Sequence, residues 1–140
     1  MLGTAWVTMA AYFSYLLLTM NLEHYYSEQD GKLIFTRQQA SDFAKRVAGD
    51  VNPIHDTDAS RFCVPGDLLL SILLAKTGIS EEIEIQFNGM ISANTPLTIV
   101  ETDEEVTVVD DDQKRYLTMT RRGAVRHDQA LATEIATHYV

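Results

Sequence analysis

The chain has 140 residues, of which 46% are hydrophobic and 22% are charged, so it is predicted to form one globular domain with a small core. Eleven basic residues stand against 20 acidic ones, and the formal net charge of −9 disfavours a phosphate backbone, so we expect no nucleic-acid partner. The single cysteine, Cys63, cannot form an internal disulfide, and no cysteine–histidine spacing suggests zinc. A reducing, cytoplasmic location is therefore predicted.

The first 22 residues, Met1 to Leu22, carry no charged side chain and are long enough to cross a bilayer. Threonine and serine dilute their apolar character, and no basic residue marks the start of a signal peptide. Three interpretations stay open: a membrane helix, a buried helix or strand, and an extension before a true start near Met20. Membrane association is not expected, and this segment is the one part of the chain through which it could occur. Residues 23–140 are predicted to form the domain.

A short strand is predicted at Lys32 to Phe35, and a helix is predicted to follow it. Thr36 and Gln39 have the spacing of a capping box, with Thr36 as the N-cap residue. Gly49 is expected to end this helix. An apolar stripe that repeats at three- and four-residue intervals is expected to face the core, and it comprises Ala40, Phe43, Ala44 and Val47.

The segment after this helix places an acid and an imidazole five positions apart across an obligatory turn. Pro53 has no amide proton and disfavours the α conformation at Asn52, so the chain must bend between Asp50 and His55. The bend can direct both side chains toward one water molecule, and such a pair is equipped for general acid–base catalysis. The competing structural interpretation is an Asp that bonds turn amides beside an ordinary turn histidine.

Asp56 or Thr57 is predicted to cap a brief helical segment through Phe62. Asp67 is predicted to cap a third helix over residues 68–76, which is apolar on almost every side and should therefore be buried. One apolar helix followed by a meander of strands predicts an α+β fold, in which an antiparallel sheet wraps around the central helix. The strand candidates are residues 83–90, 97–101, 106–109, 116–121 and 132–139, of which the last could begin as a helix.

Charged residues crowd the region that follows this helix. The basic residues there could meet the phosphates of a coenzyme or pair with the acidic hairpin beside them. Cys63, between Phe62 and Val64, is interpreted as a small buried hydrophobe. The basic residues concerned are Lys114, Arg115, Arg121, Arg122 and Arg126.

The motif Gly49-Asp50-Val51-Asn52-Pro53-Ile54-His55 and the order of elements around it resemble the MaoC-like hydratase branch of the hot-dog superfamily, over about residues 31 to 123. The chain is also similar to an uncharacterised bacterial family related to that branch. In the hydratases, the Asp and His of the motif bind the water that adds to a trans-2-enoyl thioester. A glycine amide that opens the central helix polarises the thioester carbonyl. The segments similar to the bacterial family are residues 25–26, 35–40 and 61–69.

The resemblance implies a hot-dog fold and a hydratase or dehydratase with Asp50 and His55 as catalytic residues and Gly66 as the oxyanion donor. Asn52 and Asp56 would brace the turn. The resemblance implies no metal or redox cofactor. Coenzyme A or a carrier protein would hold the substrate as a thioester. A homodimer is expected, or a double hot-dog whose second half comes from a longer chain, since a single layer leaves an edge strand exposed.

Two departures from the hydratase pattern favour an alternative function. Pro65 stands where these hydratases usually have a histidine, and the connection from His55 to Gly66 is shorter than theirs. The alternative is a non-catalytic hot-dog module that binds an acyl thioester or pairs with another subunit.

Overall fold

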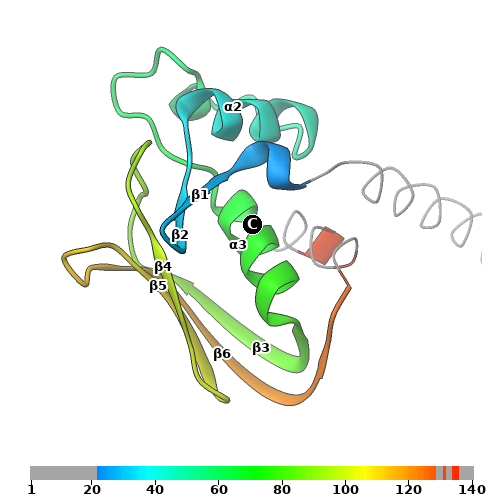
Figure 1. Cartoon of the computed structure of the whole chain (residues 1–140). Coiled ribbons are helices and arrows are strands. Elements are labelled where there is room, and N and C mark those ends of the chain that lie inside the picture. The colour runs from blue at the N-terminus through cyan, green and yellow to red at the C-terminus, as the bar shows by residue number, and fades with distance from the viewer. Residues whose placement is uncertain (1–21, 129–130, 132–133, 136–140) are drawn as a thin grey trace, which may run out of the picture.

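The computed structural model describes residues 22–128, 131, 134 and 135. Within them, α-helices and two antiparallel β-sheets form the α+β architecture that the sequence predicts (Figure 1). Of the apolar segment at residues 1–22, only Leu22 is described, so the predictions for that segment lie outside the described residues. The strand predicted at 132–139 also falls mostly outside them, and the two residues described there, Glu134 and Ile135, are helical.

The described chain begins with the 3-10 helix η1 (Leu22–Tyr25) and the strands β1 (Ser27–Gln29) and β2 (Lys32–Ile34), followed by helix α2 (Arg37–Arg46). Strands β1 and β2 pair as an antiparallel hairpin. The strand and the helix predicted in this region are both confirmed: the strand ends one residue early, and the helix ends at Arg46, two residues before its predicted end.

The predicted capping box starts helix α2. Thr36 Oγ1 accepts a hydrogen bond from the Gln39 amide at 3.1 Å, and the Thr36 amide donates to Gln39 Oε1 at 3.1 Å. Two amides that a helix N-terminus leaves unpaired are thereby satisfied. The predicted apolar stripe faces inward, with Ala40, Phe43 and Ala44 fully buried.

Helix α3 (Gly66–Thr77) is the centre of the fold. Nearly all its side chains are buried, as predicted for a helix with no polar face. The prediction that Asp67 caps it is wrong, because Pro65 occupies the N-cap position and Asp67 is the second helical residue. The fixed φ of proline suits the approach to a helix, and the Pro65 carbonyl accepts from the amides of Leu68 at 3.2 Å and Leu69 at 3.4 Å.

The larger sheet contains β3 (Ile79–Phe87), β4 (Thr98–Glu101), β5 (Glu105–Val109) and β6 (Arg115–Arg126). The strand order is β3-β6-β5-β4, and every neighbouring pair is antiparallel. The sheet bends around α3 (Figure 1), and an isolated bridge between Leu33 and Leu97 joins it to the β1–β2 hairpin. The sheet is thus wrapped around the apolar helix as predicted, although the strands form two sheets.

Predicted and observed strand boundaries differ most in β3 and β6. Strand β3 begins at Ile79 and ends at Phe87, whereas residues 83–90 were expected. Strand β6 continues to Arg126, five residues beyond its predicted end. The two strands pair along this whole length, with a register shift between Ser80 and Glu82. Backbone pairing therefore extends both strands into segments that lack an apolar pattern.

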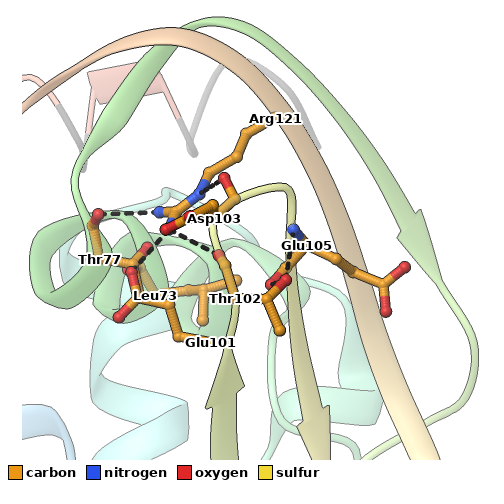
Figure 2. A network of polar contacts seen from close by, with 7 residues as sticks. All are labelled: Leu73, Thr77, Glu101, Thr102, Asp103, Glu105 and Arg121. Atoms are coloured by element: carbon orange, nitrogen blue, oxygen red, sulfur yellow. Dashed lines mark hydrogen bonds and ion pairs between the residues drawn. The ribbon is translucent and has the colours of Figure 1, made fainter.

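Arg121 ties the end of α3 to the sheet (Figure 2). Arg121 is only 8% exposed. Its guanidinium donates hydrogen bonds to Glu101 Oε2 at 2.8 Å and to three backbone carbonyls: Thr77 at 3.0 Å, Thr102 at 3.0 Å and Asp103 at 3.3 Å. The charge thus sits at the carbonyl end of the helix, where a cation is favoured.

The open question about the basic cluster is settled for two of its members. Arg121 pairs with Glu101, and Arg115 Nη1 lies 3.8 Å from Glu105 Oε1, so both pair with the acidic hairpin. Cys63 is buried, as predicted. Among the described residues, no helix has the length and apolarity to cross a membrane.

Candidate active site

The end of helix α2 positions Asp50. Gly49 adopts a φ of 64°, in the left-handed region where glycine replaces other residues without strain. The Asp50 amide then donates to the Ala44 carbonyl at 2.7 Å. The helix itself ends at Arg46 with Val47 as its C-cap, earlier than predicted, and Gly49 turns the chain so that Asp50 lies at a fixed place beside the last turn.

The predicted bend occurs between Asp50 and His55 and is held by two side chains. Asp50 Oδ1 accepts from the Asn52 amide at 2.9 Å, and Asn52 Oδ1 accepts from the Ile54 amide at 3.2 Å. Asn52 thereby caps the 3-10 helix η2 (Pro53–His55), as a turn-bracing residue would. The helical segment predicted from Asp56 or Thr57 to Phe62 is wrong, because the helical turn precedes Asp56 and the residues after it form turns.

Across this bend, Asp50 and His55 face each other. Asp50 Oδ2 lies 3.3 Å from His55 Nε2, with the Asp50 side chain 40% exposed and the His55 side chain 8% exposed. One carboxylate oxygen therefore serves the turn and the other faces the imidazole. The interpretation of Asp50 as a turn residue is correct for Oδ1, which accepts from the Asn52 amide. Oδ2 faces the imidazole of His55 instead.

The other imidazole nitrogen of His55 is fixed by the backbone. Nδ1 lies 2.7 Å from the Cys63 carbonyl, which can only accept, so Nδ1 carries a hydrogen. In the neutral ring, Nε2 is then an acceptor that faces a second acceptor, Asp50 Oδ2. Two acceptors at this separation can share one water or one proton, and this is the requirement for general acid–base work.

Asp56 points to a different partner. Its Oδ1 lies 3.1 Å from Lys45 Nζ, which ties the loop after the bend back to α2. Arg37 reinforces the same junction by donating to the carbonyls of Thr57 at 3.0 Å and Ala59 at 2.7 Å. Asp56 thus braces the loop and makes no described contact with the Asp50–His55 pair.

Gly66 is the first residue of α3, at the position expected of an oxyanion donor. Among the described residues no acceptor is found for its amide. The space where a Cβ would stand is filled by the Phe87 ring, whose Cε1 would be 3.0 Å and Cζ 3.2 Å away. The absent side chain therefore makes room for Phe87.

Asp67 is a titratable residue of this region for which the sequence predicted only a capping role. It is 7% exposed, and its Oδ1 accepts from the Leu68 amide at 3.0 Å. Burial raises the pKa of its carboxyl above the usual 3.8, the negative charge of Asp50 raises it further, and the Leu68 hydrogen bond and His55 oppose the rise. The signal in the sequence was a lone acid at the start of an otherwise apolar helix.

Exposed apolar side chains flank the pair in the sequence and lie near the start of α3. Val51 follows Asp50 and is 83% exposed, and Ile54 precedes His55. Phe87 lies on Gly66, and Met90 precedes Ile91, whose carbonyl accepts from the Val64 amide at 2.9 Å. These four side chains form the apolar rim of the candidate site: Val51, Ile54, Phe87 and Met90.

In the part of the chain that the structure describes, no group of three His, Cys, Asp or Glu side chains is arranged to hold a metal ion. A protein-family model matches residues 20–140, and its description reads "Protein of unknown function (DUF3581)". No curated protein matches the chain closely enough to count as a relative.

Proposed function

We propose that the chain, which belongs to the family matched over residues 20–140, is an enoyl-thioester hydratase or dehydratase of the MaoC-like hot-dog type. The observation that supports this function is the Asp50–His55 pair. Its two side chains meet at 3.3 Å across a braced turn, and the imidazole is held in one tautomer by the Cys63 carbonyl. The proposal includes the hot-dog assignment and action in the cytoplasm.

In the proposed reaction, Asp50 Oδ2 and His55 Nε2 hold one water. The water oxygen bonds to the β-carbon of the enoyl thioester while the pair takes one of its protons. The pair then returns a proton to the α-carbon, so that a 3-hydroxyacyl thioester forms and the pair is regenerated. Positioned proton transfer of this kind is worth about 10²–10⁴-fold in rate.

Charge develops on the thioester oxygen during the addition, and the start of α3 is the proposed place where it is stabilised. Amides at a helix N-terminus point outward and carry partial positive charge. The Gly66 amide is the proposed donor. Since the Phe87 ring lies on Gly66, we propose that this ring moves aside or forms the wall of the thioester site.

The proposed substrate is an acyl group carried as a thioester by coenzyme A or a carrier protein. The apolar rim is the proposed contact for its acyl chain. Val51 and Ile54 are exposed beside the polar pair in the chain, and Phe87 and Met90 are exposed near the start of α3. A pocket that is mostly apolar with a few convergent polar groups is typical of small-molecule sites. A second hot-dog half, from a second copy or from a longer chain, would enclose this rim.

The test is turnover of crotonyl-coenzyme A and longer trans-2-enoyl thioesters by the purified full-length protein. Asp50→Asn and His55→Gln should each lower kcat about 10²–10⁴-fold with little change in the circular dichroism spectrum. Asp58→Asn, an exposed acid eight residues after Asp50, is the matched control and should leave kcat unchanged. Absence of hydration and dehydration above background would refute the enzyme.

The alternative is a non-catalytic module that binds an acyl thioester, and two observations favour it. The Phe87 ring fills the space beside Gly66, and Pro65 stands where the hydratases usually have a histidine. Such a module would bind a saturated acyl-coenzyme A with the same Kd in the wild type, Asp50→Asn and His55→Gln, and none of the three would turn over an enoyl thioester.

A further inference from the structure

Strand β3 is one edge of the larger sheet. It contains nine residues, Ile79–Phe87, and among the described residues the only strand that pairs with it is β6. In an antiparallel edge strand, alternate residues turn their N–H and C=O groups away from the sheet. A row of backbone donors and acceptors is thus open to another strand along β3.

The side chains of β3 differ between its two faces. Ile83 and Ile85 are half-buried on the face that packs toward the core. Glu82 and Glu84 are exposed on the opposite face, where their neighbours across β6 are Arg122 and Thr120. Glu82 therefore has a basic neighbour in the sheet, and Glu84 does not.

The acidic character continues across the outer face of the sheet. An open groove of about 1060 Å³ begins at β3, and its carboxylates come from Glu82, Glu84, Asp103, Glu104 and Glu105. Arg121 also lines the groove, but its guanidinium is already paired with Glu101, so Arg122 is the other basic residue of the groove lining, and Arg126 lies opposite Ile79 at the far end of β3. None of these residues belongs to the Asp50–His55 site.

A second copy of the chain does not fit this edge at neutral pH. Two β3 strands that pair antiparallel along their full length are centred on Ile83, which keeps the isoleucines of both on the core side. That register sets Glu82 of each copy opposite Glu84 of the other. Like charges directly opposite one another destabilise strand pairing, and charged edge residues are a known protection against self-association.

We infer that the β3 edge accepts a β-strand of a different polypeptide that carries Lys or Arg at alternate positions. Its basic side chains would meet Glu82 and Glu84 and reach the acidic groove. The residues between them, if apolar, would cover Ile83 and Ile85. Such strand addition takes affinity from main-chain hydrogen bonds and specificity from alternate side chains. The inference does not depend on the hydratase reaction.

A charge-reversed copy of the same protein is a suitable probe, because its β3 keeps the isoleucine spacing. We would mix full-length wild type with an affinity-tagged Glu82→Arg/Glu84→Arg variant and measure mixed dimers by native mass spectrometry and light scattering. The mixed dimer should be at least tenfold tighter than the dimer of either protein alone and should weaken at high salt. Hydrogen exchange should show new protection at residues 79–87.

The matched control is Asp58→Arg/Asp112→Arg, which makes the same charge change at two exposed acids outside β3. Mixed dimers that form equally well with this control would show general electrostatic attraction and overturn the inference. So would a wild-type dimer that already protects residues 79–87, or no mixed dimer above the level of self-association. If the double variant does not fold, Glu84→Arg alone, whose neighbour on β6 is Thr120, serves the same test.

Discussion

The Phe87 ring lies on the first residue of the central helix, Gly66, so closely that a Cβ there would meet ring atoms at 3.0 and 3.2 Å. Phe87 ends strand β3, and Gly66 begins α3. The contact therefore joins the sheet to the helix terminus that the proposed mechanism uses as an oxyanion donor.

Gly66→Ala should be less favourable to the free energy of unfolding than an ordinary glycine-to-alanine change in a helix, because the added methyl group requires the Phe87 ring to shift. In a Phe87→Ala background the same substitution should be more favourable, since alanine is otherwise favoured in a helix. Urea unfolding of the two single variants and the double variant measures this coupling. Equal effects of Gly66→Ala in both backgrounds would contradict the contact.

Gly49→Ala should lower the free energy of unfolding by about 1–2 kcal/mol, the usual penalty for a side chain in the left-handed region. No atom lies within 4 Å of the added Cβ, so the change acts on the backbone alone. Gly49→Asn should be milder because asparagine tolerates this conformation. Chemical denaturation of both variants tests the difference, and a harmless Gly49→Ala would show that the chain turns toward Asp50 in another way.

Arg121→Met should destabilise the fold by at least about 2 kcal/mol, because it leaves the buried Thr77 carbonyl without its donor and frees the Glu101 carboxylate. Arg122→Met, at the exposed neighbouring position, should change stability by less than about 0.5 kcal/mol. Thermal and urea unfolding compare the two. Similar values for both variants would mean that the Arg121 network contributes little.

Asp67→Asn should change how stability depends on pH. Burial raises the pKa of Asp67 in the folded state, so its contribution is fully present below the unfolded value, near 3.8, and is lost as pH rises through the folded pKa. The unfolding free energy of wild type relative to Asp67→Asn should therefore fall as pH rises from about 4. A wild-type advantage that grows with pH would contradict the assignment.

Local signals in the sequence predicted the helices well. The Thr36–Gln39 capping box depends on neighbouring residues only and is where it was expected, whereas α2 ends at Arg46, shortly before the Gly49 that was expected to end it. The bend that brings Asp50 to His55 also has a local cause, Pro53. The brief helix expected before Phe62 failed because Asn52 caps an earlier turn.

The contacts that needed the fold could not be predicted. Phe87 and Gly66 are distant in the sequence, so no local pattern indicates that the ring fills the space of the absent side chain. The early start of β3 and the late end of β6 arise from their mutual pairing, since neither extension shows an apolar alternation. The burial of Asp67 likewise depends on the fold, because its sequence neighbours do not indicate it.

The most direct test of the acid–base role of Asp50 and His55 is hydration of a trans-2-enoyl thioester in D₂O, followed by NMR of the 3-hydroxyacyl product. If the pair delivers the proton to the α-carbon, the wild type should place one deuterium there with a single stereochemistry, and Asp50→Asn and His55→Gln should form no such product above background. A wild type that leaves the enoyl thioester unchanged, or variants that label it as fast as the wild type, would contradict the proposed function.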